Sequence, residues 1–557
     1  MKIVLCSINS KFIHSSLGVW YLYSAYKQTQ THHAVTVYET TINNQIEDIV
    51  ADLTRTKGEV IGFSCYIWNI EYVKKIAMTL KQINPKLIIF LGGPQASYDA
   101  CDLLKNEWVD LIIKGEGEQP FVQLLKSDFH TSLQIVEQDY NCRTYYNPYT
   151  PEYFAALGGR ICYLETSRGC PFSCAFCLSG ASENVRFFDM DISKQNIIAL
   201  ANSGTQTVKF VDRTFNCNVE RTLEIFKFIT EQREKGEIPR GIVFHFEIEA
   251  DLLTKEILDY LATVPKGLFQ FEAGLQSFNV KTLQAVNRRS DINRLVGNLK
   301  AIVAMGNIHL HIDLIAGLPY EDYDSFTKGF DLAYKIRANV IQLGFLKLLK
   351  GSTLERENAL YNYKYLQYPP YQVLSNDSIS YEDLLKLKTA EDVVERLLNS
   401  GRFAKTIEFL LEKTALAPYQ LFFEFGEYVQ RIGLHSPSLD TYTTALFEYF
   451  KGREGIEERA LRDVIAYDRI TTDRGGKLFA CLHINDERLK HISIAFKNVE
   501  LGIFQNQQEK ARQSKLGFCI IYSQGTEKVL VADYTDYDSV KGIYASKMIE
   551  LSEILAE

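Results

Sequence analysis

Two series of short apolar runs, each alternating with segments of helical periodicity, constrain the fold of this 557-residue chain more than any other feature. The first series predicts strands at residues 2–7, 35–39, 60–65, 86–91 and 109–113. Strands that alternate with helices in this way are typical of a parallel sheet with helices on both faces. The sequence therefore predicts a doubly wound, Rossmann-like α/β domain over residues 1–135.

The second series begins after residues 136–155, a segment rich in Tyr, Asn and Pro that we expect to be a linker. Its apolar runs predict strands at residues 162–166, 207–212, 242–247, 268–273, 309–315 and 340–346. Successive β–α units of this kind are typical of a partial (β/α)6, TIM-like barrel, whose functional loops lie at the carboxyl ends of the strands. We expect this barrel to occupy residues 156–365.

The pattern changes beyond residue 365. Residues 366–470 have mainly helical periodicity, with helices expected at 389–400, 404–414 and 442–450. Over residues 471–557, alternation of polar and apolar positions predicts strands at 477–484, 491–497, 517–522 and 528–534. We therefore expect a mixed α+β C-terminal domain, and we recognise no catalytic motif in it.

Composition narrows the class of protein. No apolar run approaches the roughly 18 residues of a membrane-spanning helix, and the first residues lack the apolar core of a signal peptide. We therefore expect a cytoplasmic protein without a membrane span. The net charge of −8 gives no electrostatic support for binding a polyanion. The 11 cysteines of such a chain are expected to be buried thiols or metal ligands rather than disulfides.

Three of these cysteines, Cys170, Cys174 and Cys177, lie in one loop directly after the first strand of the second series. A structural zinc site would need a fourth ligand, and the nearest candidates are Cys162, in the strand upstream, and Cys217, beyond the second strand. Three cysteine ligands to a 4Fe–4S cluster instead leave one iron open to an external ligand. We therefore favour an iron–sulfur cluster over a zinc site.

The spacing of these cysteines, with an aromatic residue before the third, resembles the radical S-adenosylmethionine (SAM) superfamily. The resemblance implies that SAM binds the open iron of the cluster. It further implies that an electron, supplied by an external donor of the flavodoxin or ferredoxin type, cleaves SAM to methionine and a 5′-deoxyadenosyl radical. The cysteines would then be cluster ligands, and the sequence assigns no acid or base catalyst.

Polar residues near the ends of successive barrel strands agree with this resemblance. Alone, each would be interpreted as a strand-end cap or as half of a surface salt bridge. Their recurrence in register favours a binding site, because carboxylates and amides hold ribose hydroxyls and Arg pairs with a carboxylate. The resemblance assigns SAM binding to Phe176, Asp212, Glu249, Gln276, Arg288 and Asp313.

Glycine-containing turns end three strands of the first domain, at residues 62–66, 92–94 and 115–118. No GxGxxG motif follows the first strand, which weakens a dinucleotide-binding interpretation. Glycines at the ligand-binding edge of a sheet let a bulky flat group approach the backbone, although ordinary βα turns also contain them. Residues 60–121 resemble the cobalamin-binding domain that precedes many radical SAM cores. The resemblance assigns cobalamin binding to Ser64, Tyr66, Trp68, Gly92, Gly93, Gly115, Glu116, Gly117 and Glu118.

One cobalamin signature is missing. The Asp-x-His-x-x-Gly motif that supplies an axial imidazole does not follow the first strand, where the nearest histidine is His14. The resemblance therefore implies a lower cobalt face covered by a side chain that is not a ligand. Tyr66 and Trp68, in the loop after the third strand, are the candidates for this role, although Trp68 would equally suit helix packing.

A 4Fe–4S cluster, SAM and cobalamin together imply an enzyme in which the adenosyl radical removes a substrate hydrogen and methylcobalamin then methylates the carbon. The substrate could be a small molecule, a peptide or RNA. One alternative is a cobalamin-dependent radical oxidoreductase or cyclase without methyl transfer. A second is sulfur insertion, as in the methylthiotransferases, which would need a second cluster on Cys6, Cys65 and Cys101. A third is a non-catalytic cobalamin sensor. The C-terminal domain resembles the extra domain of functionally unassigned cobalamin-binding radical SAM proteins.

Overall fold

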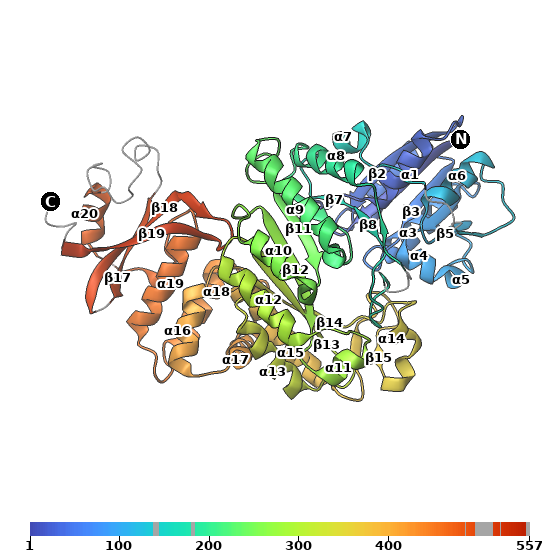
Figure 1. The fold of residues 1–557 in the computed structure, drawn as a ribbon. Coiled ribbons are helices and arrows are strands. Elements are labelled where there is room, and N and C mark those ends of the chain that lie inside the picture. Colours follow the sequence, from blue (N-terminus) through green and yellow to red (C-terminus); the bar gives the residue numbers. More distant parts are fainter. Residues whose placement is uncertain (138–143, 180–183, 485, 496–515, 524, 553–557) are drawn as a thin grey trace.

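The structure is a computed structural model that describes residues 1–137, 144–179, 184–484, 486–495, 516–523 and 525–552. In Figure 1 the N-terminal sheet lies toward one end of the molecule, the second sheet in the middle and the C-terminal sheet at the other end. Residues 138–143 of the expected linker and 496–497 of one expected strand lie outside the described residues.

The N-terminal domain is a parallel sheet with the strand order β2-β1-β3-β4-β5-β6. Its strands are β1 (Lys2–Asn9), β2 (Ala34–Thr41), β3 (Val60–Ser64), β4 (Ile88–Gly92), β5 (Leu111–Lys114) and β6 (Ile135–Glu137). The doubly wound fold is confirmed, and β6 is an additional strand that the sequence does not predict. The chain direction across the sheet reverses between β1 and β3, where open α/β sheets bind their ligands.

Helices cover both faces of this sheet because its strands are apolar on both sides. On one face, α1 (Gly18–Lys27) and α6 (Glu118–Lys126) pack together. On the other face lie α2 (Ile46–Arg55), α3 (Ile70–Ile83), α4 (Pro94–Tyr98) and α5 (Ala100–Leu103). The carboxyl ends of β3 and β4 and the turn after β5 line a cavity, through Ser64, Gly92 and Gly115.

The second sheet has its strands in chain order, β7-β10-β11-β12-β13-β14, and all neighbours are parallel. The strands are β7 (Cys162–Leu164), β10 (Thr207–Phe210), β11 (Val243–Ile248), β12 (Phe269–Gln276), β13 (His309–Ala316) and β14 (Val340–Phe345). Because β7 and β14 do not pair with each other, the sheet is an open barrel, as expected. A short hairpin of β8 (Ser167–Arg168) and β9 (Arg186–Phe187) follows β7.

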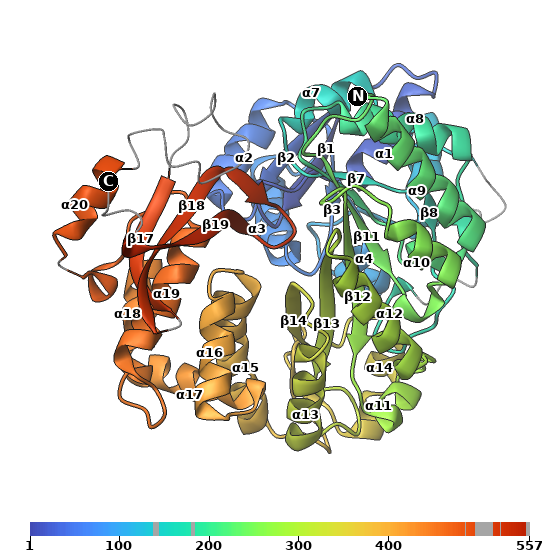
Figure 2. The ribbon, with the colours of Figure 1, turned by 60° about the vertical axis from the view of Figure 1, so that its left-hand side comes forward.

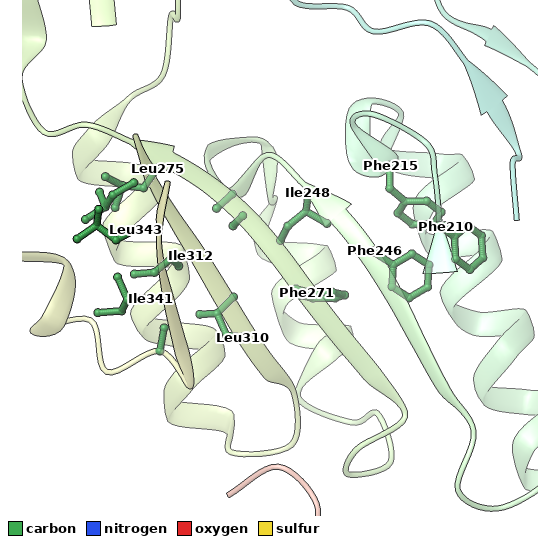
Figure 3. Packing of buried hydrophobic residues seen from close by; sticks show 14 of the residues in the cluster. Phe210, Phe215, Phe246, Ile248, Phe271, Leu275, Leu310, Ile312, Ile341 and Leu343 are labelled. Atoms are coloured by element: carbon green, nitrogen blue, oxygen red, sulfur yellow. The ribbon is translucent and has the colours of Figure 1, made fainter. Parts of the chain in front are cut away.

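The two faces of the second sheet differ in chemistry. Its outer face carries buried apolar side chains, among them Phe246, Phe271 and Leu310, which Figure 3 shows along neighbouring strands. The helices that follow the strands are α8 (Met190–Ala201), α9 (Val219–Glu234), α10 (Lys255–Leu261), α11 (Val280–Ala285), α12 (Ile292–Met305) and α13 (Tyr323–Tyr334). The opposite face alternates with this one and is polar, unlike the apolar layers that fill an ordinary closed barrel.

The C-terminal part combines helices with an antiparallel sheet, as expected. Its main helices are α15 (Tyr381–Val393), α16 (Ala404–Thr414), α17 (Pro418–Arg431), α18 (Leu439–Phe450), α19 (Glu458–Thr472) and α20 (Arg488–Ala495). Its sheet consists of β17 (Leu516–Ser523), β18 (Thr526–Asp538) and β19 (Ile543–Glu550). Smaller elements are α7 (Pro151–Leu157), α14 (Thr353–Arg356), β15 (Lys364–Tyr365) and β16 (Val373–Ser375). Figure 2 shows α15 and α16 between the barrel strands and α19.

Two expected C-terminal strands are wrong. Residues 477–484 form a loop with a 3-10 turn at Ala480–Leu482, because their apolar side chains pack against helices instead of extending a sheet. Residues 491–495 belong to α20, in which Leu489 and Ile492, three residues apart, both pack against the C-terminal sheet. The strands expected at 517–522 and 528–534 lie within β17 and β18.

The outer edge of β14, the last strand of the second sheet, is hydrogen-bonded by the side chain of Asn399. Asn399 ends a π-helical turn, accepts a hydrogen bond from Ile341 N–H at 2.9 Å and donates one to the Ile341 carbonyl at 3.0 Å. Because Asn399→Ala removes both partners, we expect the free energy of unfolding to fall by about 1–3 kcal/mol. Denaturant unfolding followed by circular dichroism measures this loss. Glu395→Gln alters only an exposed contact to the same side chain and should cost less than about 0.5 kcal/mol; equal losses would contradict the prediction.

Candidate functional site

A cavity of about 820 Å³ lies between the carboxyl edge of the first sheet and the barrel. The barrel side of the wall includes Tyr163, Glu165, Lys209 and Glu247, together with residues of the cysteine loop such as Gly169. A volume of this size suits a cofactor site. From the first domain, the cavity is lined by all the residues that the sequence assigned to cobalamin: Ser64, Tyr66, Trp68, Gly92, Gly93, Gly115, Glu116, Gly117 and Glu118.

Backbone rather than side chains borders much of this cavity. Gly93 follows β4 with φ of 92°, and a Cβ atom there would lie 2.7 Å from the Cys65 carbonyl oxygen. Cys65 N–H in turn donates to the Gly92 carbonyl at 2.7 Å, so the turns after β3 and β4 are packed directly on each other. Only glycine fits at position 93, and its small size leaves the strand ends open to a ligand.

The loop after β3 is fixed by a buried amide. Asn69 precedes α3 but does not cap it; its side chain donates to the carbonyls of Ile8 at 3.0 Å and Ser64 at 2.8 Å, and accepts from Tyr66 N–H at 2.8 Å. This anchoring holds the Tyr66 and Trp68 rings in a parallel stack, with centroids 4.3 Å apart. The stack faces the cavity, with the Trp68 indole 43% exposed.

His14 connects the loop after β1 to the barrel. One of its ring nitrogens, Nδ1, lies 2.6 Å from the Tyr163 hydroxyl on β7, and both side chains line the cavity. Burial lowers the pKa of His14, and Lys11 and Lys209 lower it further, which favours the neutral imidazole. Sequence analysis did not assign a role to this pair, because its members are 149 residues apart and meet only in the folded chain.

The polar lumen of the barrel lies beside the same cavity. Lys209 contacts Glu272 at 3.2 Å, and His245 contacts the same carboxylate at 3.0 Å. The His245 hydrogen bond lowers the pKa of Glu272 to about 2 against the effect of burial, and Lys209 assists. Burial, helped by the neighbouring His309 and His245, lowers the pKa of His311 to about 4. Neutral imidazole and ionised carboxylate groups thus line this face.

The cysteine loop begins at a turn that requires glycine, since Gly169 has φ of 100°. It is held by Ala175, whose N–H donates to Val286 and whose carbonyl accepts from Leu354, both at 2.9 Å. Burial raises the pKa of the Cys174 thiol, and the Arg288 guanidinium, with Nη1 at 3.9 Å from the sulfur, partly offsets this. All three motif cysteines are half-buried, and none of them forms a disulfide.

The sulfur positions distinguish a cluster from a single zinc ion. Three sulfurs around one tetrahedral zinc would lie about 3.8 Å apart, since Zn–S bonds measure about 2.3 Å. The sulfurs of Cys170, Cys174 and Cys177 do not all lie within 4.8 Å of one another. They are therefore more widely spaced than the ligands of a single zinc ion. Cys162, buried on β7, donates weakly to a neighbouring carbonyl, and Cys217 is half-buried in η2 (Phe215–Cys217).

Arg288 is the centre of the residues assigned to SAM. Its Nη2 donates to Glu249 at 2.6 Å and to the Gly274 carbonyl, and both members of the Arg288–Glu249 pair have side chains less than 10% exposed. Burial raises the pKa of Glu249 to about 7 although Arg288 opposes the shift. Gln276, with φ of 67°, lies close enough that a Cβ on Gly274 would collide with its amide. These residues share one site at the carboxyl ends of β11 and β12.

The remaining assigned residues lie in different surroundings. Asp212 is buried and accepts hydrogen bonds from Thr166 N–H, the Thr166 hydroxyl and the Ser167 hydroxyl at 3.0, 2.7 and 2.5 Å. Burial raises its pKa to about 6 against these bonds. Its carboxylate therefore fixes the start of the cysteine loop, and its contact with SAM stays a prediction. Asp313 is on the polar face of β13, and Phe176 is half-buried against the core.

Three family models match consecutive parts of the chain. A B12 binding domain model matches residues 3–125, and a Radical SAM superfamily model matches residues 164–333. The first range contains the glycine turns and the second contains the cysteine loop. The chain contains a B12-binding domain followed by a radical SAM domain. The third model, described as a protein of unknown function (DUF4080), matches residues 359–518, after the radical SAM domain.

The radical SAM domain implies a 4Fe–4S cluster and SAM, and the B12-binding domain implies cobalamin. The residues present fit these groups. Soft thiolates suit iron–sulfur clusters. Within the described part of the chain, three buried polar atoms at the assigned SAM site have no hydrogen-bond partner: Gln276 Oε1, Arg288 Nε and Asp313 Oδ1. Such atoms are costly unless a ligand satisfies them.

Two curated relatives point to different outcomes. The 2-(S-pantetheinyl)-carbapenam-3-carboxylate methyltransferase of Streptantibioticus cattleyicolor is 25% identical over 315 residues, 51% of this chain and 46% of that protein. The anaerobic magnesium-protoporphyrin IX monomethyl ester cyclase of Rubrivivax gelatinosus is 23% identical over 188 residues, 28% of this chain and 34% of that protein. The chain therefore spans less than half the length of these relatives.

A solved structure shares the fold. The cobalamin-dependent S-adenosylmethionine radical enzyme OxsB, with aqua-cobalamin bound, superimposes with a TM-score of 0.55 at 14% identity; the match covers 84% of this chain and 79% of that chain.

Among the described helices, none combines the length and the apolar character that a membrane crossing requires. The second cysteine trio, considered above for sulfur insertion, consists of buried Cys6 and Cys65 and exposed Cys101, and these do not form a metal-binding group.

Proposed function

We propose that this protein is an enzyme that methylates a carbon atom of its substrate. The observation that carries the proposal is the single cavity bordered both by the glycine turns of the B12-binding domain and by the cysteine loop of the radical SAM domain. When bound, the cluster and SAM supply a radical that removes a hydrogen atom from the substrate, and cobalamin supplies the methyl group. A shared cavity lets one substrate reach both groups.

The residues of the chain have positioning roles in this proposal. Cys170, Cys174 and Cys177 hold the cluster, and the Arg288–Glu249 pair beside Cys174 orients the amino acid part of SAM. The remaining SAM contacts are Phe176, Asp212, Gln276 and Asp313. The stacked Tyr66 and Trp68 rings line the cavity and would lie against bound cobalamin. As in cofactor enzymes generally, the protein binds, orients and excludes water.

A second candidate is ring formation without methyl transfer, which the similarity to the cyclase of Rubrivivax gelatinosus favours. Sulfur insertion has less support, because Cys101 is exposed whereas Cys6 and Cys65 are enclosed in the core. Two further parts of the proposal are an external flavodoxin- or ferredoxin-type electron donor and a cytoplasmic location. The requirement of a radical SAM domain for a reductant supports the first, and the free thiols support the second.

Deuterated SAM separates these functions without knowledge of the substrate. Anaerobically reconstituted protein is reduced in the presence of hydroxocobalamin and SAM carrying a CD3 group, and the products are analysed by mass spectrometry. Methylation predicts both 5′-deoxyadenosine and transfer of the CD3 group to cobalamin. 5′-Deoxyadenosine without transfer of the label would favour the cyclase and overturn the methylation proposal. Absence of both products would indicate a non-catalytic sensor.

We expect SAM to bind more tightly as the pH rises from 6 to 8. Burial raises the pKa of Asp313 to about 7, and Glu272 and Glu247 add to the shift, so this side chain gains its negative charge in that interval. A charged carboxylate attracts the sulfonium of SAM; a change of one pKa unit on binding corresponds to about tenfold in Kd.

The raised pKa of Asp313 also affects stability. The free energy of unfolding should fall as the pH rises from about 4 through 7, because the folded state favours the protonated form of Asp313.

Equilibrium dialysis of SAM against reconstituted protein measures this dependence. Asp313→Asn is expected to show a smaller change in the Kd for SAM between pH 6 and pH 8 than the wild type; Glu249, whose pKa is also raised to about 7, accounts for the remaining change. The control is Glu321→Gln, since burial also raises the pKa of Glu321 to about 7 but its carboxylate accepts from Ser277 and is not among the residues assigned to SAM. An undiminished pH dependence in Asp313→Asn, or a diminished one in Glu321→Gln, would show that Asp313 is not responsible.

A further inference from the structure

Arg168 lies at the boundary between the two domains and two residues before Cys170. Its guanidinium is only 21% exposed, and it forms ion pairs with three carboxylates. The sequence assigned it no role. Two of its three partners, Glu116 and Glu118, belong to the turn after β5 that borders the cobalamin cavity.

All three nitrogens of the Arg168 guanidinium donate hydrogen bonds. Its Nε and Nη2 donate to the two oxygens of Glu165 at 2.9 and 2.8 Å, a bidentate pair within the radical SAM domain. Its Nη1 donates to Glu116 at 2.6 Å and to Glu118 at 3.0 Å, across the domain boundary. A lysine ammonium cannot reproduce this fork, because it presents its donors from a single point.

Aromatic rings from both domains flank the same guanidinium. The Tyr21 ring of α1 lies 5.0 Å from the Arg168 carbon Cζ, and the Phe188 ring, just after β9, lies 5.7 Å away. Glu116 also accepts from Arg186 of β9 at 2.7 Å. Burial would raise the pKa of Glu116, but the two arginines lower it below its usual range, so the carboxylate is ionised. The network is therefore charged, partly shielded from water and shared by the two domains.

Arg168 is also continuous with the cysteine loop. It ends β8, pairs with Arg186 of β9, and is followed by Gly169, whose φ of 100° turns the chain toward Cys170. A shift of the Arg168 backbone would move this turn and, with it, the first cluster ligand. A displacement of Glu116 and Glu118 would therefore be transmitted through Arg168 to the position of Cys170.

Docking of the two domains does not depend on Arg168 alone. Arg160 pairs with Glu39 of β2 at 2.9 Å, and Lys350 pairs with Asp99 of the first domain at 2.6 Å. Neither of these pairs contacts the cysteine loop in a described hydrogen bond. A pair needed only to join the domains would be redundant with them, whereas Arg168 joins the cavity wall to the residue at which the cysteine loop begins, and Arg186 of β9 adds a second contact to Glu116.

We propose that Arg168 is a positioning residue through which cobalamin in the cavity orders the cysteine loop. Cobalamin against the 115–118 turn fixes Glu116 and Glu118, these hold the Arg168 fork, and Arg168 sets the turn at Gly169. The inference rests on the proposed function in one respect, namely that cobalamin fills the cavity. Its consequence is that the cluster site is fully formed only when cobalamin is bound.

Hydrogen exchange measured by mass spectrometry tests this coupling. Anaerobically prepared protein containing its cluster is compared with and without hydroxocobalamin, and peptides covering residues 115–118 and 165–179 are followed. Cobalamin is expected to slow exchange in both segments of the wild type by about fivefold or more. In Arg168→Lys, which keeps the charge but loses the fork, only the 115–118 segment should be slowed, while the Kd for cobalamin from absorbance titration changes less than about threefold.

The electron paramagnetic resonance spectrum of the reduced cluster provides a second measurement. Cobalamin should alter the spectrum of the wild type and leave that of Arg168→Lys unchanged. Glu118→Gln keeps the Glu165 and Glu116 contacts of Arg168 and should show an intermediate loss of protection; this variant decides the question if Arg168→Lys does not fold. Asp99→Asn is the matched control, because it removes a domain-joining ion pair that does not involve the cysteine loop.

The outcomes separate the two proposals. If wild-type protein binds cobalamin and is protected at 115–118 but not at 165–179, the coupling is overturned and the cofactor assignment stands. If wild-type protein does not bind cobalamin, the proposed function is overturned together with the coupling. Equal loss of protection in Asp99→Asn and Arg168→Lys would assign the effect to domain docking in general and overturn the specific role of Arg168.

Discussion

Replacing Cys174 by Ala is expected to reduce the iron content of anaerobically purified protein from about four atoms per chain to below about one, and to reduce SAM cleavage to background. The reason is that a cluster held by three thiolates has no protein ligand to replace the missing sulfur. The polar group that contacts the Cys174 sulfur at 3.9 Å, Arg288 Nη1, is a cation and cannot ligate iron. A colorimetric iron assay and chromatography of 5′-deoxyadenosine measure the two losses.

Cys217→Ala is the matched control for this prediction. Cys217 is also a half-buried free thiol and lies in η2, directly after Thr214, whose hydroxyl is 3.5 Å from the Cys170 sulfur. We expect this variant to retain about four iron atoms and normal SAM cleavage. Loss of iron from Cys217→Ala would identify it as a ligand. About eight iron atoms in the wild type would instead revive the sulfur-insertion alternative.

Replacing Arg288 by Met is expected to lower the free energy of unfolding by about 1–3 kcal/mol, because it removes a hydrogen-bond donor from the buried Glu249 carboxyl and from the Gly274 carbonyl. The same change removes the guanidinium beside Cys174, so SAM affinity should fall by at least about tenfold. Burial already raises the pKa of Glu249 to about 7 with Arg288 present; without Arg288 the carboxyl should be protonated at neutral pH. Denaturant unfolding and equilibrium dialysis of SAM provide the measurements.

Two comparisons isolate the buried pair. Arg288→Met combined with Glu249→Gln removes the titratable carboxyl as well, so its stability should not change between pH 6 and pH 8, and it should not recover SAM binding. Lys255→Met breaks an exposed pair with Asp259, one helical turn away, and should cost less than about 1 kcal/mol. If Arg288→Met is no less stable than Lys255→Met, burial of the pair does not contribute to stability in the way described.

The two parallel sheets could be predicted because strands buried on both faces, or on one face of a barrel, appear in the sequence as apolar runs of characteristic length. The strand β6 could not, since it is only Ile135–Glu137 and its pairing with β5 gives no local signal. The strands expected at 477–484 and, within its described part, at 491–495 were wrong for the opposite reason. Apolar residues alternate in both segments, but tertiary packing against helices and against the C-terminal sheet determines the conformation.

For the candidate site, the motifs that lie within one short segment could be predicted from the sequence. The side-chain contacts across the domain boundary could not. The glycine turns and the cysteine loop border one cavity because the carboxyl ends of parallel strands meet at one edge. Asp212 shows the limit of such reasoning: its place at a strand end is predictable, but its hydrogen bonds to Thr166 and Ser167 are not. Arg168 remained unassigned because its partners Glu116 and Glu118 are about 50 residues away.

The joining of the two domains by separate ion pairs has a consequence for the lifetime of the holoenzyme. Glu39, Asp99 and Glu116 lie in different parts of the first domain, on β2, before α5 and after β5, and each is bound to a different part of the chain beyond it. Hinged opening of the cavity would have to break these contacts together. We therefore expect cobalamin to exchange slowly, at a rate set by local unfolding, and to be acquired most readily before the domains dock during synthesis.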